Sequence, residues 1–259
     1  MARDVVEMSK ERLSAKEVQK ATATRGTLYR FLSRGFSLEV DEPFLEWVVK
    51  LQPVIEQLAE ENDDRDFVEG SRLLKRFVEK VKADFERDKG AFLTDLAAEY
   101  ASLFLNVGPR PVHLVESVYL GKNHLLYEKP NFDAIRIYRL YEFKKRASFR
   151  EPEDHIAIEL EFMAHLCDFT VKSIESGKLD YAAGYLDNQR EFLESHICKW
   201  SPQLAEKLNG ASKNPFYLSL GALLKGFVTV DGSLIPHLAD GLGSRKRPDN
   251  RAPEAGAAS

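Results

Sequence analysis

A histidine and several carboxylates stand close together in Glu151-Pro152-Glu153-Asp154-His155 and in Glu159, one helical turn further on. This segment opens a stretch in which apolar residues recur with the period of an α-helix. His155 and Glu159 fall on the apolar face, whereas the polar face carries Glu161, His165, Asp168, Lys172 and Glu175. A buried polar group without a partner costs on the order of a few kcal/mol. The sequence therefore predicts that this pair meets a partner from elsewhere in the fold, or a ligand.

Two interpretations of Asp154, His155 and Glu159 follow from their chemistry. A histidine coupled to a carboxylate can titrate near neutral pH, so the three residues could be the acid and base groups of a helical enzyme or a nucleotide-binding protein. Alternatively, they form a helix-start arrangement. In that arrangement Glu153 or Asp154 lies at the positive end of the helix dipole, and His155 forms a hydrogen bond inside the core. The residue types alone leave both interpretations open.

Other catalytic and metal-binding patterns are weak. His165 and Cys167, and likewise His196 and Cys198, are two residues apart, so on a helix they point in nearly opposite directions and cannot chelate one ion. Asp154-His155 has the reverse order of the HD-type phosphohydrolase pair. Neither a phosphate-binding glycine loop nor an exposed nucleophile motif is present. We expect no metal, no cofactor and no catalytic residue.

Composition predicts the class of protein. The chain has 259 residues, enough to bury a core without disulfides, and its two cysteines lie within expected helices. The formal net charge of −4 argues against a general affinity for nucleic acid. The charged N-terminus does not resemble a signal peptide, and we expect no run long enough to span a membrane. These features indicate a cytoplasmic protein without stable membrane insertion.

Helical spacing recurs almost throughout, so we expect an all-α, bundle-like fold of about nine to eleven helices. Asp41 and Pro43 are typical of a helix start, Pro53 should kink or divide that helix, and Gly90 should mark a break. The expected helices cover residues 15–36, 42–51, 67–85, 92–105, 131–146, 155–174, 179–200, 202–208 and 215–228. We further expect a flexible N-terminus (1–14), an N-terminal subdomain (15–147), a C-terminal subdomain (148–240) and a disordered tail (241–259).

Three segments, taken in chain order, resemble the TorD/DmsD/NarJ family of redox-enzyme maturation chaperones. The first is residues 25–36 with Asp41-Glu42-Pro43. The second is Tyr100-Ala101-Ser102-Leu103-Phe104, a Y-x-x-L-F pattern, followed by Glu116-Ser117-Val118-Tyr119-Leu120. The third is the E-P-x-D-H segment 151–155 with its helix, and His196 to Trp200 resembles a later helix end of the family. Together these segments extend over most of the chain.

The resemblance implies a non-enzymatic, cytoplasmic chaperone that is a monomer or a domain-swapped homodimer. Its partners would be the twin-arginine signal peptide and the apo form of a molybdopterin oxidoreductase subunit, held until the cofactor is loaded. The implied signal-peptide contacts are Glu151, Pro152, Asp154, His155, Glu159, Tyr100, Phe104, Glu116 and Tyr119. Where many relatives carry a Pro-Trp pair, this chain has Leu114-Val115, which indicates a different client or binding pose.

Overall fold

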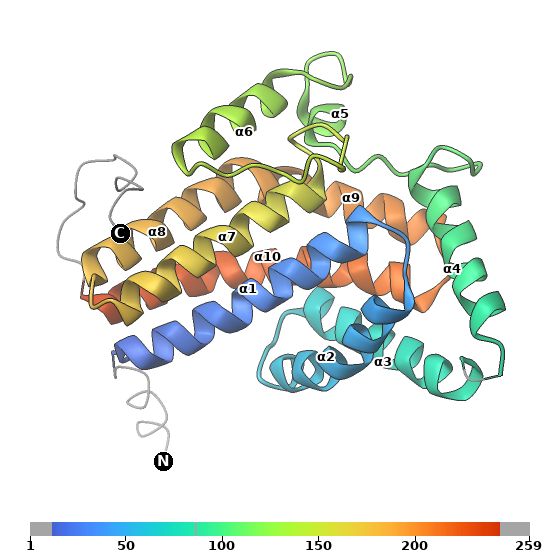
Figure 1. The fold of residues 1–259 in the computed structure, drawn as a ribbon, viewed down its shortest axis with the longest axis horizontal. Helices are drawn as coiled ribbons and strands as arrows, with labels where there is room; N and C mark the ends of the chain where they lie inside the picture. The colour runs from blue at the N-terminus through green and yellow to red at the C-terminus, as the bar shows by residue number, and fades with distance from the viewer. Residues whose placement is uncertain (1–11, 86, 244–259) are drawn as a thin grey trace.

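The computed structural model describes residues 12–85 and 87–243, and within these ranges the protein is all-α, as predicted. Figure 1 shows an elongated helical bundle on which α5 and α6 form a separate layer. The helices are α1 (Ala15–Ser37), α2 (Glu42–Glu60), α3 (Arg65–Asp84), α4 (Lys89–Phe104), α5 (Glu116–Leu120), α6 (Lys129–Leu140), α7 (Ile156–Glu175), α8 (Leu179–Phe192), α9 (Cys198–Ala211) and α10 (Pro215–Leu242). A π-helical turn, Leu193–Ile197, joins α8 to α9.

Helix α1 begins with a capping box that the sequence analysis did not identify. The Ser14 side chain accepts a hydrogen bond from the Glu17 backbone N–H, and the Glu17 carboxylate accepts one from the Ser14 N–H at 2.8 Å. The helix buries Leu28, Phe31 and Leu32, and it packs along α7 and α10. Its predicted extent is confirmed to within one residue at each end.

In the first half of the chain α2 is not divided, and the helix break expected at Gly90 lies just before this residue, between α3 and α4. Asp41 caps α2 as predicted, since its Oδ1 accepts a hydrogen bond from Phe44 N at 2.9 Å. Pro53, however, does not divide α2, which continues to Glu60. Gly90 itself lies in the first turn of α4, whose N-cap is Asp88. Leu51, Gln52 and Ile55 around Pro53 are buried, so packing overrides the low helix propensity of proline there.

The second half departs from the expected boundaries in three places. Helix α6 ends at Leu140, and Glu142 beyond it has a positive φ of 53°, so the basic residues 144–146 lie in a loop. The π-helical turn interrupts the expected helix 179–200. Helix α10 continues to Leu242, well beyond the predicted end at Val228 and two residues into the predicted tail. The rest of that tail, 244–259, and most of the predicted flexible N-terminus, 1–11, lie outside the described residues.

Helix α10 is long and apolar enough to pass as a membrane span, a possibility that the sequence analysis missed. More than half of that stretch is buried in the bundle, where it packs against α1, α3, α8 and α9. At Gly226 the backbone of α10 approaches α3 so closely that an added Cβ would lie 2.1 Å from Phe67 N. Helix α10 is therefore buried in the way that a core helix of a bundle is.

A buried ion pair joins α1 to α10. Arg25 Nη2 donates to Asp231 Oδ2 at 2.9 Å, and the Tyr29 hydroxyl donates to the same oxygen at 2.5 Å. Together with the contact of α1 with α7, this pair means that helices of both predicted subdomains pack against each other. The division into subdomains at residue 147 remains a prediction.

Candidate functional site

The E-P-x-D-H segment is fixed to the chain that precedes α5. Val115 and His155 form an isolated antiparallel bridge. On one side of it Glu116 N donates to Asp154 O at 2.9 Å, and on the other Ile156 N donates to Leu114 O at 2.8 Å. These backbone bonds hold the start of α5 against the start of α7, so two segments about forty residues apart meet at this turn.

Asp154 is fully buried and serves as a cap for α5. Its Oδ2 accepts hydrogen bonds from Ser117 N, at 2.8 Å, and from the Ser117 hydroxyl. Burial raises the pKa of Asp154, while the two bonds from Ser117 act in the opposite direction. The other oxygen, Oδ1, has no hydrogen-bond donor among the described residues. The carboxylate thus supplies the side-chain cap that Val115, at the N-cap position of α5, cannot supply.

His155 is buried on the core side, as expected, but it is the N-cap of α7 and precedes the first helical residue, Ile156. Its Nδ1 accepts a hydrogen bond from Ala157 N at 3.1 Å, and the ring packs edge-on against Phe149. Burial, with Lys145 nearby, lowers the pKa of His155 to about 3. The imidazole is therefore neutral at physiological pH, which suits an acceptor at a helix start and not an acid–base group.

Glu159 lies in a buried cluster with Glu116 and His196, and in these three residues candidate ligand atoms approach within 4.8 Å of one another. His196 Nδ1 is 2.7 Å from Glu116 Oε2, and Trp200 Nε1 donates to Glu159 Oε2 at 3.2 Å. Glu159 Oε1 has no donor among the described residues. Burial, followed by the repulsion of Glu116, raises the pKa of Glu159 well above its usual value. The sequence predicted a partner for Glu159 but not its identity.

The remaining predicted contact residues are distributed around this core. Tyr119 packs its ring against Trp200, and its hydroxyl donates to His113 O at 2.8 Å. Tyr100 and Phe104 pack against each other, with the Tyr100 hydroxyl donating to Phe36 O at the end of α1. Pro152 is buried, whereas the side chain of Glu151 is exposed. The structure thus brings Asp154, Glu159 and Glu116 together, and Tyr119 lies next to Trp200, the hydrogen-bond donor to Glu159.

In this conformation the buried members of the set offer no surface to a peptide. Asp154 and Glu159 have no exposed area, and His155 is 5% exposed. Each already makes a contact that shapes the local backbone or fills the core. The helix-start interpretation of Asp154 and His155 therefore describes their geometry. Direct contact between a signal peptide and these side chains stays a prediction.

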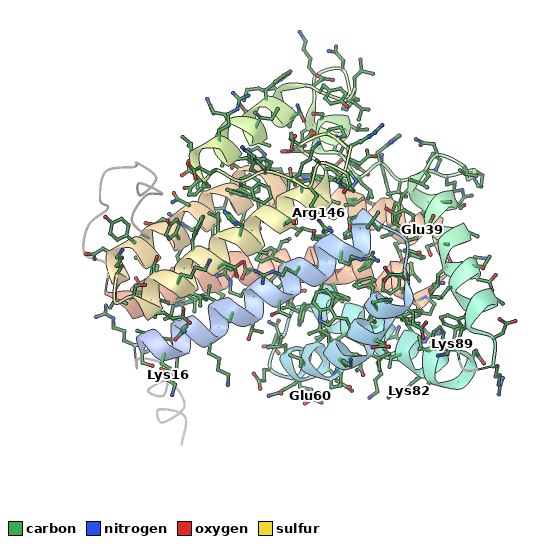
Figure 2. All side chains as sticks on the ribbon, in the orientation of Figure 1. Lys16, Glu39, Glu60, Lys82, Lys89 and Arg146 are labelled. Carbon is green, nitrogen blue, oxygen red and sulfur yellow. The ribbon has the colours of Figure 1, made fainter. Side chains whose placement is uncertain are left out.

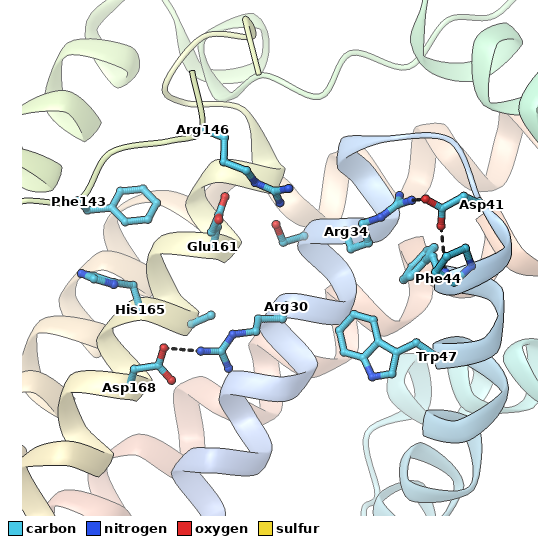
Figure 3. A pocket seen from close by; sticks show the side chains of 13 residues that line it. Arg30, Arg34, Asp41, Phe44, Trp47, Phe143, Arg146, Glu161, His165 and Asp168 are labelled. Atoms are coloured by element: carbon cyan, nitrogen blue, oxygen red, sulfur yellow. Dashed lines mark hydrogen bonds and ion pairs between the residues drawn. The ribbon is translucent and has the colours of Figure 1, made fainter. Parts of the chain in front are cut away.

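A cavity of about 510 Å³ opens between α1, α2, α7 and the loop that carries Phe143 and Arg146 (Figure 3). Two ion pairs lie in it: Arg30 with Asp168, and Arg34 with Asp41, the latter at 3.0 Å. The carboxylate of Glu161 makes no hydrogen bond or ion pair with another described residue. The side chains that line the cavity are Arg30, Ser33, Arg34, Asp41, Pro43, Phe44, Trp47, Phe143, Arg146, Glu161, Ala164, His165 and Asp168.

Glu161, His165 and Asp168 lie together on the polar face of α7, as predicted. This face was expected to be solvated, without a cavity. The cavity could not be predicted, because α1 and α2 supply its opposite wall and their position depends on tertiary packing. The only available signal was the coincidence of acidic residues on α7 with arginines on the outward face of α1.

The chain is similar to one protein family and to several curated proteins. Residues 60–206 match the model of a family described as nitrate reductase delta subunit. Curated relatives are named chaperone protein TorD. The protein from Vibrio parahaemolyticus is 25% identical over 223 residues, which cover 85% of this chain and 98% of the relative. Those from Aliivibrio fischeri and a Psychrobacter species are 28% and 26% identical, covering 80% and 88% of this chain and 92% and 98% of the relatives.

Proposed function

The chain belongs to the nitrate reductase delta subunit family, and on that premise we propose that it is a cytoplasmic chaperone for a molybdopterin oxidoreductase. In this role it binds the twin-arginine signal peptide of the apoenzyme and assists cofactor loading before export, without catalysing a reaction itself. The observation that carries the proposal is the similarity to TorD chaperones along nearly their whole length. The alternative, acid–base chemistry by Asp154, His155 and Glu159, has no support from the geometry, because these buried residues already have structural contacts.

We assign the peptide to the cavity of Figure 3, because it combines the carboxylates of Glu161 and Asp168 with the partly exposed rings of Trp47 and Phe143. Glu161 and Asp168 lie on one face of α7, seven residues apart, which separates them by about 10.5 Å along the helix. Two neighbouring arginines of an extended peptide can each reach one of these carboxylates. Arginine is favoured over lysine at such sites because its planar guanidinium can donate two parallel hydrogen bonds to one carboxylate.

Two of the three arginines that line the cavity, Arg30 and Arg34, are paired with its aspartates. Glu161 has no ion-pair partner among the described residues, so it can accept the first guanidinium directly. Asp168 is paired with Arg30, but both side chains are nearly half exposed, at 45% and 43%. An exposed ion pair contributes at most about 1 kcal/mol, so a second guanidinium can replace Arg30 at small cost. Trp47 and Phe143 then offer apolar surface to the residues that follow the arginines.

The buried members of the predicted contact set have a positioning role in this proposal. The cap of α7 by His155 fixes where the helix begins, and therefore the direction in which Glu161 points. Glu151, which is exposed and precedes the turn, remains available as a peripheral contact. Whether the protein acts as a monomer or as a domain-swapped homodimer stays a prediction.

Titration calorimetry with a synthetic twin-arginine peptide tests the function. We expect measurable binding of the arginine peptide and markedly weaker binding of the same peptide with both arginines replaced by lysine. Glu161→Gln should weaken binding of the arginine peptide by about tenfold, the value of one charge-assisted hydrogen bond of about 1.5 kcal/mol. The matched control is Glu60→Gln, since Glu60 is exposed at the end of α2 and lies well away from Arg146 in Figure 2.

The controls separate the function from the location of the site. Equal, negligible heats for both peptides would contradict the chaperone proposal. A different result is that the chain prefers the arginine peptide and that Glu161→Gln and Glu60→Gln bind it equally well. This result would retain the function but place the peptide outside this cavity.

A further inference from the structure

The buried cluster of Glu116, Glu159 and His196 does not line the proposed peptide cavity, and it combines groups that are unusual in a protein interior. All three side chains are buried, at 2%, 0% and 5% exposure, and their candidate ligand atoms lie within 4.8 Å of one another. Among the described residues neither carboxylate pairs with a lysine or arginine. Two buried carboxylates so close together need a positive counter-charge or a shared proton.

We propose that Glu116, Glu159 and His196 form a binding site for one divalent transition-metal ion, with Zn²⁺ as the best match. One imidazole nitrogen and two carboxylate oxygens are a donor set that Zn²⁺ accepts, and the three come from separate parts of the chain. Glu116 lies in the first turn of α5, Glu159 in the first turn of α7, and His196 in the π-helical turn before α9. A metal there would tie these three segments together.

The unpartnered oxygen of Glu159 supports the site independently of the clustering. Glu159 Oε2 accepts the Trp200 indole N–H, but Oε1 has no donor although the residue is fully buried. A buried oxygen without a partner is rare in native structures, and this one needs either a proton shared with Glu116 or a bound cation. A metal ion bound to Oε1 satisfies it, while Trp200 orients the carboxylate from the other side, as outer hydrogen bonds commonly do around metal ligands.

The π-helical turn is the second feature that this proposal explains. Such turns are rare and occur frequently at functional sites. Here the turn comprises Leu193–Ile197 and contains His196, whose Nδ1 lies 2.7 Å from Glu116 Oε2. Two ligands of a tetrahedral Zn²⁺ at bond lengths of about 2.1 Å stand about 3.4 Å apart, so these atoms must separate by about 0.7 Å. Metal binding would therefore replace the present contact between Glu116 and His196.

A cavity gives the ion a route to the cluster. Glu116 and His196 both line a hollow of about 580 Å³ beside α5, α6 and the π-helical turn. The remaining coordination position can therefore be taken by water from this side. The other side chains that line the hollow include four basic and three acidic ones, namely Lys122, Lys129, Arg136, Lys199, Glu128, Asp133 and Glu191, so its mouth does not present a single sign of charge.

The test uses the full chain after treatment with a chelator, titrated with ZnCl₂ in a calorimeter. We expect one equivalent of Zn²⁺ to bind, and His196→Gln and Glu159→Gln each to weaken binding by at least about tenfold. The matched control is His237→Gln, an exposed histidine on α10 that should leave binding unchanged. Circular dichroism shows whether each variant is folded. Glutamine at position 159 can still accept the Trp200 hydrogen bond, so this variant is expected to fold.

A second measurement leaves all three ligands intact. The chain has two tryptophans, and Trp47→Phe leaves Trp200 as the only one. Paramagnetic Co²⁺ at the site should quench the emission of Trp200, and added Zn²⁺ should restore it by displacement. A folded, chelator-treated chain that takes up no Zn²⁺ would overturn the proposal. So would Zn²⁺ binding that survives in both folded ligand variants, or Co²⁺ binding without quenching of Trp200.

Discussion

The contact between Asp154 and Ser117 predicts a large difference between two substitutions at one position. Asp154→Ala removes the acceptor of two buried hydrogen bonds, from Ser117 N at 2.8 Å and from the Ser117 hydroxyl. Asp154→Asn keeps one carbonyl oxygen that can accept both bonds. It also replaces the unpartnered Oδ1 by an amide donor, next to carboxylates that repel a negative charge. We therefore expect the alanine variant to be much less stable than the asparagine variant.

The magnitude follows from the two lost bonds. Removing a helix cap costs about 1 kcal/mol, within a range of roughly 0.5–2 kcal/mol. Leaving the buried Ser117 hydroxyl unsatisfied costs about 1–3 kcal/mol more. Asp154→Ala should therefore lower the free energy of unfolding by about 2–4 kcal/mol, and Asp154→Asn by less than about 1 kcal/mol. The melting temperature of the alanine variant should fall by roughly 4–16 °C for a chain of this size.

Urea denaturation followed by circular dichroism measures both free energies, and calorimetry with the twin-arginine peptide measures binding by the asparagine variant. Binding close to that of the unmodified chain is expected, because Asp154 is buried. Two results would refute the reasoning. One is an alanine variant as stable as the unmodified chain. The other is an asparagine variant that keeps full stability but no longer binds the peptide, which would make Asp154 a contact residue.

Two further predictions concern stability. The pKa of His155 in the folded chain is about 3, below the ordinary value of 6.5, so the unfolded chain takes up a proton at a higher pH than the folded chain does. The contribution of neutral His155 to the free energy of unfolding is therefore complete above pH 6.5 and is lost as the pH falls toward 3. At pH 5 this loss is about 2 kcal/mol. His155→Asn keeps a cap acceptor that does not titrate, so urea denaturation at pH 7 and pH 5 should show a smaller loss of stability for this variant. An equal loss of stability at pH 5 in both proteins would contradict this prediction. Gly226→Ala places a Cβ 2.1 Å from Phe67 N and should destabilise the chain by about 1–3 kcal/mol. At Gly210 an added Cβ meets no neighbouring atom within 4 Å, so Gly210→Ala should stabilise the chain by up to about 1 kcal/mol. Similar melting temperatures for the two alanine variants would argue against the close approach of α10 and α3.

Helix positions were predictable where the sequence carries both an apolar period and a start signal. Asp41 with Pro43 marks the start of α2, and Asn214 with Pro215 marks the start of α10, which is confirmed at the expected residue. Helix ends were less predictable, because a helix end depends on what the last turn packs against. Pro53 lies inside α2 although proline normally interrupts a helix, and α10 continues for another fourteen residues beyond Val228.

For the candidate sites, the sequence predicted which side chains are buried or exposed but not which residues meet one another. The apolar spacing correctly placed Glu159 in the core and Glu161 on the polar face. It could not show that Glu116 and His196 meet Glu159, because these residues are 43 and 37 positions away from it in sequence and only tertiary packing brings them together. His155 was placed in the helix because periodicity does not distinguish an N-cap from the first helical residue.

Helix α7 joins the two proposed sites, and its geometry determines which substitutions can test each of them. Glu159 and Glu161 are two residues apart, so their side chains point in nearly opposite directions, one toward the buried cluster and the other into the cavity of Figure 3. A change at Glu159 alters buried charge and therefore stability and metal binding together. A change at Glu161 alters a partly exposed group and leaves the core contacts in place. Loss of peptide binding therefore identifies a contact residue directly when it follows substitution on the outer face of α7, whereas for a buried residue it does so only when the variant keeps full stability.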